Sequence, residues 1–468
     1  MKPSLQLPRA LRRELSDWRI WWSRALVMGA AIAAGLTVVA FTWLTEQAFG
    51  AFGQLRAWQW WTPLFATPLV AASAVALTRR FAPGAAGSGI PQVLAALSTE
   101  VAPEQRSLFV SLRLSLAKML LTAWGLVGGL SLGREGPSVQ IAAGVMQGVA
   151  RFLPRGAAVN EQGLLVAGGA AGIAAAFNAP LAGVMFAIEE LSKRPEQRSS
   201  GLLVSAIVLA GLIGVSINGN ATYFGVIRVP EVGLALILPG LLVALSCGVA
   251  GGLFARLLSA GLAGQPFDAP ARLRQRRPVL FAALCGLAVA VIGLATQGAA
   301  FGSGYEYTHG LLAGTAGVIG LYALLKFVAT WLTSWSGVPG GIFAPSLAVG
   351  AAIGQDIALL TGYPHPTTLI ALGMAGFLAA ATRAPLTAFI IVMEMVDGHA
   401  MVLSLMASAL LASGVSRLLS PPLYHLLSEL QLRRLPARAA DTTAVEDESA
   451  APGDIAEAPR PDDRSASL

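Results

Sequence analysis

The sequence has little charge for its length. Only 12% of its 468 residues are Asp, Glu, Lys or Arg, whereas a soluble domain usually carries about 25%. Hydrophobic residues make up 55% of the chain. A surface that faces water needs charged groups, so this composition excludes an ordinary soluble domain. The formal net charge of +7 predicts basic loops beside a membrane, and we expect no binding to nucleic acid.

Cysteine and histidine are also scarce, with two and four copies. Cys247 and Cys285 both lie in apolar segments, which favours two packed thiols over a disulfide. No glycine-rich segment is followed by a Lys-Ser or Lys-Thr pair, so the sequence lacks the phosphate-binding loop of an ATPase. We therefore expect no metal site, no cofactor, no catalytic residues and no step driven by ATP hydrolysis.

Long apolar runs dominate the rest of the composition. About a dozen windows between residues 25 and 419 approach the roughly 20 apolar residues that a membrane-spanning helix needs. The sequence predicts an all-α polytopic membrane protein. We assign residues 1–24 to a basic cytoplasmic segment, 25–430 to the membrane domain and 431–468 to a cytoplasmic tail. The tail is rich in Ala, Pro, Asp, Glu and Ser, a composition typical of disorder.

Two stretches of the chain recur in the same order. Residues 133–139 (GREGPSV) are matched by 341–347 (GIFAPSL). Residues 168–181 are matched by 373–386, and both end in Ala-Pro-Leu. The two pairs have nearly the same offset, which indicates an internal duplication. We place repeat one at about 25–218 and repeat two at about 233–430.

The charges near the repeats indicate that the two are inverted. Basic residues follow the first Ala-Pro-Leu segment, at Lys193, Arg194 and Arg198, whereas Asp397 and His399 follow the second. Because Lys and Arg collect in cytoplasmic loops, these equivalent ends face opposite sides of the membrane. We expect both termini in the cytoplasm and a plasma (inner) membrane location. Inverted repeats place a transport site at their interface, where interrupted helices meet.

Three glycine-rich segments with a following proline predict helix starts inside the membrane. They are residues 87–91 (GSGIP), 133–137 (GREGP) and 341–345 (GIFAP). The N-terminus of a helix carries partial positive charge and unpaired N–H groups, and both attract anions. Ser88 either caps the helix that follows it or turns its hydroxyl group toward a ligand. Together the three starts predict an anion site.

Glutamate side chains inside a membrane need a functional or structural reason. Glu135 lies at a helix start, where its carboxylate can occupy the anion site and leave it on protonation. We expect Glu394 to be structural. Glu189 and Glu190 are neighbours, so they point to different faces of a helix, and we expect one of them to relay protons. The other is expected to pair with a basic side chain, with Lys118, Lys193 and Arg194 as candidates.

The three helix starts, in this order and spacing, resemble the signature motifs of the CLC family of chloride channels and transporters. The resemblance implies a fold of two inverted-topology helical repeats with broken helices in the membrane interior. It also implies a homodimer with one pore per subunit and chloride as the transported ion. By motif, the residues that match the chloride ligands of the family are Ser88, Ile342, Phe343 and Tyr424. Glu135 matches the gating glutamate and outer proton acceptor, and Glu190 matches the inner proton-transfer glutamate.

The resemblance implies a transporter and not an enzyme. It favours secondary active exchange of chloride for protons, because family channels tend to lack the acid found here at Glu190. The alternative is a passive, voltage- or pH-gated chloride channel of the same fold. An intramembrane protease is a further alternative, but Ser88 lacks the Gly-x-Ser-Gly setting of rhomboid-like proteases. Gln92 and Leu94 stand where some antiporters carry acids, so we expect a different charge network around Lys118.

Overall fold

The structure is a computed structural model that describes residues 18–154, 159–192, 200–219, 222–227, 233–264 and 268–433. The chain divides into two units, Met1–Leu432 and Arg433–Leu468, and the second is described at Arg433 alone. Three expectations therefore lie mainly or wholly outside the described residues: the cytoplasmic segment 1–24, the basic cluster after the first Ala-Pro-Leu segment and the tail 431–468.

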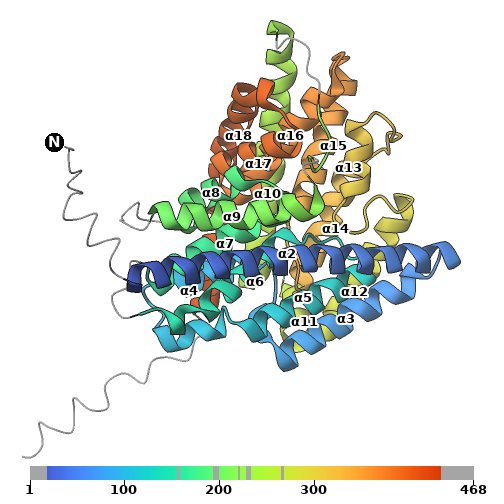
Figure 1. The fold of residues 1–468 in the computed structure, drawn as a ribbon. Helices are drawn as coiled ribbons and strands as arrows, with labels where there is room; N and C mark the ends of the chain where they lie inside the picture. The colour runs from blue at the N-terminus through green and yellow to red at the C-terminus, as the bar shows by residue number, and fades with distance from the viewer. Residues whose placement is uncertain are drawn as a thin grey trace, which may run out of the picture. The chain divides into compact units, whose positions relative to one another are not determined.

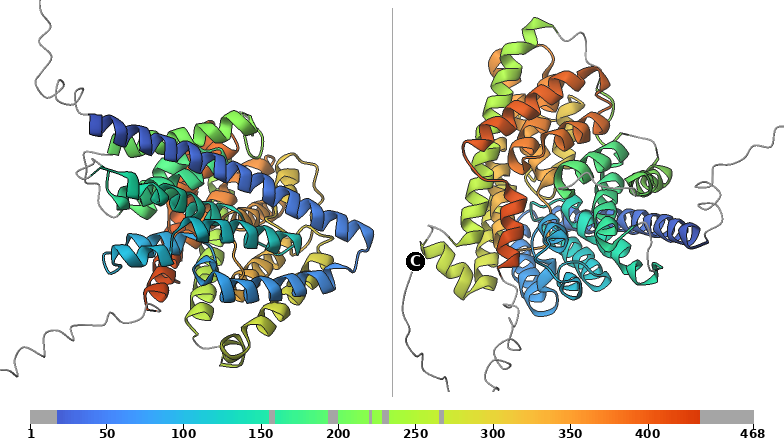
Figure 2. Two further views of the ribbon diagram at one scale, coloured as in Figure 1. Left: turned by 60° about the horizontal axis from the view of Figure 1, so that its bottom comes forward. Right: turned by 90° about the vertical axis from the view of Figure 1, so that its left-hand side faces the viewer.

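Helices make up the first repeat. Its elements are α2 (Trp18–Trp58), α3 (Pro63–Phe81), η1 (Pro83–Ala85), α4 (Ile90–Leu97), η2 (Pro103–Leu108), α5 (Leu112–Val127), α6 (Glu135–Gly148), η3 (Ala150–Phe152), α7 (Glu161–Phe177), α8 (Pro180–Phe186), the π-helical turn η4 (Ala187–Leu191) and α9 (Ser200–Asn218). With 41 residues, α2 is about 60 Å long, so it must tilt to fit a hydrocarbon layer of about 30 Å. Figures 1 and 2 show it lying across the other helices of this repeat.

The second repeat follows the same plan. Its elements are η5 (Leu234–Leu236), α10 (Ile237–Ala263), α11 (Asp268–Arg276), α12 (Pro278–Ala295), α13 (Tyr305–Leu312), α14 (Tyr322–Ser336), α15 (Phe343–Thr361), α16 (Pro366–Thr382), α17 (Pro385–Met395), η6 (His399–Met401), α18 (Val402–Arg417) and α19 (Leu423–Leu432). Helix α6 packs on α7 as α15 packs on α16, and α7 packs on α9 as α16 packs on α18. This recurrence confirms the predicted fold of two helical repeats.

Seven helices in the described ranges are long and apolar enough to cross a membrane, and four shorter apolar helices accompany them. Others are too short to cross. Helix α4 has eight residues and is about 12 Å long. Such helices begin inside the protein, as expected of interrupted helices in a membrane domain. The chain is a multi-pass membrane protein.

The helix breaks in the two repeats are built alike. Helices α7 and α16 end at Asn178 and Arg383, which adopt left-handed φ angles of 56° and 67°. Helices α8 and α17 then begin at Pro180 and Pro385, where proline suits the first helical turn. The repeated Ala-Pro-Leu motif is therefore a helix–break–helix signal.

Glycine lets the paired helices approach closely. A side-chain carbon added at Gly350 of α15 would overlap the carbonyl oxygen of Gly373 of α16, and the reverse also holds. In the first repeat, a carbon at Gly172 of α7 would overlap the carbonyl oxygen of Ser138 of α6. Small residues at such crossings are typical of membrane helices, whose association depends on tight packing.

Two buried lysines hold equivalent loops. The Lys118 ammonium group donates hydrogen bonds to the carbonyl oxygens of Ala85 (2.8 Å) and Gly87 (2.6 Å). Lys326, at the equivalent place in repeat two, bonds to its own loop in the same way, with Ala300 (2.9 Å) and Gly302 (2.8 Å) as acceptors. Of the three candidate basic partners for a glutamate, Lys118 is thus excluded, because backbone carbonyls accept from its ammonium group, while Lys193 and Arg194 lie outside the described residues.

Glu189 and Glu394 each cap a helix of the other repeat. The Glu394 carboxylate accepts hydrogen bonds from the N–H groups of Leu181 (3.2 Å) and Ala182 (2.8 Å) at the start of α8. The Glu189 carboxylate accepts them from Leu386 (3.0 Å) and Thr387 (2.7 Å) at the start of α17. The structural role expected for Glu394 is confirmed.

Candidate functional site

The three predicted helix starts converge on one point. Gly133 and Gly341 pair as an antiparallel bridge, in which each N–H group donates to the other carbonyl oxygen at 2.8 Å. The N–H group of Gly340 also donates to the carbonyl oxygen of Gly87 at 3.0 Å. Gly89 has a φ angle of 114°, and a side-chain carbon there would lie 2.5 Å from the carbonyl oxygen of Gly136. Glycine is therefore required where these loops touch.

Ser88 does not cap the helix after it. Gly89 occupies the N-cap position of α4, and no side chain bonds to the first turn. The Ser88 hydroxyl instead lies against Gly136 and close to the Tyr424 hydroxyl. Neither hydroxyl has a hydrogen bond of ordinary geometry among the described residues, although both oxygens are buried. Of the two roles considered for Ser88, the geometry favours a hydroxyl turned toward a ligand.

Ile342 and Phe343 form the start of α15 and are buried. The helical hydrogen bonds begin when Ser346 donates to the Ile342 carbonyl at 2.9 Å, so the N–H groups of the first turn have no helical acceptor. One of them, from Ala344, donates to the Glu135 carboxylate at 3.4 Å. Glu135 itself is fully buried. A carboxylate thus lies at the positive end of α15.

Tyr424 completes the cluster from the end of the chain. Helix α19 packs against α4, which brings the Tyr424 ring parallel to the Phe343 ring with centroids 6.1 Å apart. Phe177 and Phe186 pack on the other sides of Phe343, at 6.3 and 6.4 Å. Sequence reasoning missed these two phenylalanines, because nothing distinguishes them from ordinary apolar residues of membrane helices.

Glu190 lies on the π-helical turn that follows α8. It is buried, and both Glu190 and Glu135 lie within electrostatic range of the Tyr424 hydroxyl, Glu190 with the larger influence. Its neighbour Glu189 points to α17, so the two acids face different directions as expected. Turns of this type occur often at functional sites. The structure therefore gathers five of the predicted site residues at the converging helix starts and places the sixth, Glu190, on the buried turn after α8.

Gln92 forms the hydrogen bonds of a neutral side chain. Its amide nitrogen donates to the carbonyl oxygen of Ala86 at 2.5 Å, which braces the loop that carries Ser88. Leu94 is buried on the same helix. Backbone carbonyl oxygens of the neighbouring loop accept from Lys118, and the expected difference in the charge network around it stays a prediction.

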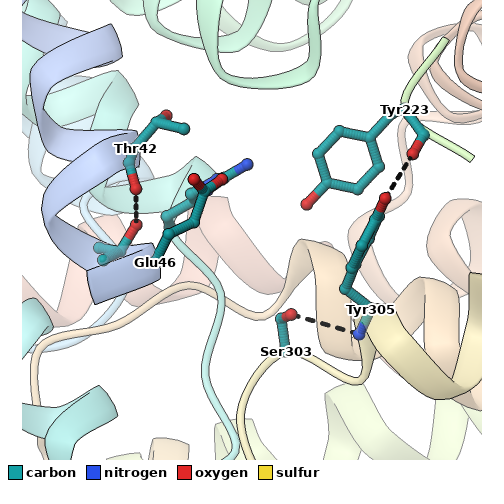
Figure 3. Close-up of polar contacts among 7 residues, drawn as sticks. Thr42, Glu46, Tyr223, Ser303 and Tyr305 are labelled. Atoms are coloured by element: carbon teal, nitrogen blue, oxygen red, sulfur yellow. Dashed lines mark hydrogen bonds and ion pairs between the residues drawn. The ribbon is translucent and has the colours of Figure 1, made fainter. Parts of the chain in front are cut away.

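A cavity of about 1010 Å³ reaches Glu135 from the side of the linker between the repeats. It is lined by α2, by Tyr223 of the linker and by the loop before α13; Figure 3 shows Glu46 of α2 facing Tyr223 and Tyr305. Arg134 also lines the cavity, and its guanidinium donates to the Glu46 carboxylate at 2.8 Å. Sequence reasoning missed Glu46, because a single acid within a long apolar helix carries no motif.

Comparison with known proteins agrees with this geometry. Residues 70–417 match the family described as voltage gated chloride channel. The chain is 31% identical over 443 residues, 90% of each chain, to the H(+)/Cl(-) exchange transporter ClcA of Salmonella paratyphi A. It is 32% identical over 456 residues to the ClcA of Klebsiella pneumoniae, covering 92% of this chain and 93% of that one.

Solved structures are also similar. A slow cyanobacterial Cl⁻/H⁺ antiporter matches with a TM-score of 0.76 and 26% identity, over 88% of this chain and 98% of that one. A eukaryotic CLC transporter matches in fold with a TM-score of 0.72 and 21% identity, over 89% of this chain and 75% of that one. The converging helix starts, the two repeats and these similarities place the chain in the CLC family of chloride channels and transporters.

Proposed function

We propose that this protein exchanges chloride for protons across the membrane and that Glu135 is its gate. The position of Glu135 carries the proposal, because its carboxylate accepts the Ala344 N–H group at the start of α15. An anion is stabilised at that place, so the carboxylate and chloride compete for the same donors. Protonation neutralises the carboxylate and lets chloride take its place. The names of the relatives, H(+)/Cl(-) exchange transporters, support the exchange.

Chloride would be held by the hydroxyl groups of Ser88 and Tyr424 and by the backbone N–H groups of Ile342 and Phe343. Lys118 contacts the Ser88 loop through carbonyl oxygens, so its charge acts from behind the loop and not as a ligand. Neutral donors and helix dipoles bind an anion weakly enough to release it, which conduction requires.

Glu190 would carry the proton on the inner side. The aromatic cluster around Phe343 offers no titratable group to a proton except the Tyr424 hydroxyl. Chloride would pass the ligands near Tyr424, while the proton would continue to Glu190. The proton and chloride routes would thus separate near Tyr424. A passive chloride channel needs no such acid, and the buried position of Glu190 favours exchange over that alternative.

Purified protein in liposomes tests the exchange. An outward chloride gradient is imposed while the internal pH is recorded. Exchange predicts that outward chloride flow drives protons inward against their own gradient, whereas a passive channel moves no protons uphill.

The variant Glu190→Gln tests the inner proton role in the same liposomes. We expect it to abolish proton movement and to keep chloride flux, because no chloride ligand is removed. Glu189→Gln is the matched control: it alters the adjacent acid, which contacts α17, and it should keep the coupling. Full coupling in Glu190→Gln would contradict the role, and loss of both fluxes with intact protein would assign Glu190 to structure.

The assembly and placement in the cell belong to the same proposal. We propose a homodimer in the plasma membrane with one pore in each subunit and both termini in the cytoplasm. Cross-linking in native membranes and labelling of single introduced cysteines at each end, with Cys247 and Cys285 both buried, would test these points.

A further inference from the structure

Arg134, the residue next to Glu135, is held between two other parts of the chain. Its guanidinium donates to the Glu46 carboxylate of α2 at 2.8 Å. The same group lies 5.7 Å from the ring centroid of Tyr223, within the range of a cation–π contact. The Arg134 side chain is 14% exposed and that of Glu46 is 60% exposed. Glu46 thus stands in the cavity, with Arg134 behind it.

Tyr223 is a fixed surface for Arg134. The Tyr305 hydroxyl donates to the backbone carbonyl of Tyr223 at 3.0 Å, and the two rings pack edge to face at 4.9 Å. The next residue, Phe224, donates its N–H group to the Met395 carbonyl at 2.9 Å. Figure 3 shows Tyr223 and Tyr305 together on the side of the cavity opposite Glu46. Tyr223 therefore fixes one side of the guanidinium, and Glu46 is the partner on the exposed side.

The charges in the cavity make this contact important for anions. Besides Glu135, the lining includes the acids Glu46 and Glu306 and the bases Arg56 and Arg134. Of these bases, Arg134 is the neighbour of Glu135 along the chain. An unpaired guanidinium there would raise the local chloride concentration. A carboxylate bonded to it cancels most of that attraction.

We propose that Glu46 is a positioning residue that holds Arg134 and neutralises it, and thereby sets how strongly this cavity attracts chloride. The proposal rests on the proposed function, because it assumes that chloride passes the cavity on its way to Glu135. It makes no use of proton coupling. Glu46 touches neither the proposed chloride site nor Glu135 in the contacts described, so it acts through Arg134.

The variant Glu46→Gln tests this inference. Glutamine keeps the length of the side chain and an oxygen acceptor for Arg134, but it removes the negative charge. We expect the chloride concentration for half-maximal flux, on the cavity side, to fall about threefold, the order expected of one unit charge in partly hydrated space. The ratio of chloride to protons should stay the same. Currents after chloride jumps on a solid-supported membrane give this concentration.

Glu306→Gln is the matched control. Glu306 lines the same cavity and loses the same charge in the variant, yet no ion pair of Glu306 is found within the described ranges. Its effect should be less than half that of Glu46→Gln. In an Arg134→Gln background, the effect of Glu46→Gln should fall to that of Glu306→Gln, because only the charge of an unpaired carboxylate is then removed.

Several outcomes would overturn the proposal. Equal effects of the two glutamine variants, an unchanged half-saturating concentration, or a full effect of Glu46→Gln without Arg134 would each do so. If Glu46→Gln does not yield folded protein, Glu46→Asp shortens the same side chain and must shift the concentration in the same direction. If the wild type moves no protons uphill, the exchange is wrong, but its passive chloride flux still tests Glu46.

Discussion

At the scale of single residues, the site uses few charged groups. The proposed chloride contacts come from two hydroxyls and a helix start, while Lys118 is turned to backbone carbonyls. Glu135 is the one acid hydrogen-bonded to that helix start in the described part of the chain. A single carboxylate at this place can compete with an anion of the same charge. In the proposed mechanism the acidic side chain of Glu135, and not a basic one, controls whether chloride occupies the site.

Glu135→Gln should uncouple chloride from protons. Glutamine resembles the protonated carboxyl group and cannot carry a proton, so chloride should pass with little dependence on pH. Chloride efflux and internal pH, recorded together in liposomes at several pH values, check this result. Uphill proton movement in the variant would show that Glu135 is not the coupling residue.

Removal of the two hydroxyls should weaken chloride binding. We expect Ser88→Ala combined with Tyr424→Phe to raise the dissociation constant at least about tenfold, because each lost hydrogen bond contributes about 1 kcal/mol. Phenylalanine keeps the ring that stacks on Phe343. Titration calorimetry measures the affinity. Ser138→Ala is the control, since the Ser138 hydroxyl bonds to the Arg134 carbonyl in its own helix, and a matching loss there would speak against the site.

At the scale of helices, each repeat supplies a glutamate that caps a helix N-terminus of the other repeat, an arrangement we call exchanged caps. The starts of α8 and α17 each receive a carboxylate from the opposite repeat. A carboxylate at a helix N-terminus satisfies N–H groups that lack helical partners and favours the local dipole. Glu394 lies on α17 and caps α8, while Glu189 lies on the turn after α8 and caps α17. These reciprocal caps fix α8 and α17 to each other.

Glu394→Gln should therefore destabilise the protein by about 1–2 kcal/mol. The amide replaces one carboxylate oxygen with a donor that faces the N–H donors of α8. Glu189→Gln should have a similar cost at α17. Thermal unfolding in detergent measures both. Glu100→Gln, on an exposed turn, is the control and should change little; equal stability of all three variants would argue against the caps.

At the scale of the whole molecule, small residues let the helices within each half pack closely. The closest crossing of α15 and α16 places Gly350 against Gly373. Since the contact is between backbones, neither helix can yield by moving a side chain.

Gly350→Ala should lower the unfolding temperature markedly, because its methyl group would overlap the Gly373 carbonyl. Gly53→Ala in α2 is the matched control, since an added carbon there meets nothing within 4 Å. Alanine is the better helix former by about 1 kcal/mol, so the control should be neutral or stabilising. A wild-type unfolding temperature for Gly350→Ala would contradict the packing argument.

The sequence predicted what motifs and periodic patterns encode. Repeated Gly-Pro segments gave the helix starts, and their resemblance to a family gave the residues around Phe343. The loop at Gly302 was missed because it lacks the proline that marks GSGIP, although Lys326 holds it as Lys118 holds the first loop. The exchanged caps and the Glu46–Arg134 pair were missed because they join distant segments. Such contacts depend on how the two halves dock, which local patterns do not encode.

The bridge between Gly133 and Gly341 has a mechanical consequence. Its two short hydrogen bonds join the loops at the centre of the protein, and the bond from Gly340 to Gly87 ties in the third loop. Hydrogen bonds of this kind resist sliding and separation of the three loops, so we expect the wall of the proposed chloride path to stay rigid. In the proposed mechanism, the part that moves is then the Glu135 side chain. We therefore expect protonation and deprotonation of Glu135 to limit the transport rate, rather than a movement of one half of the protein against the other.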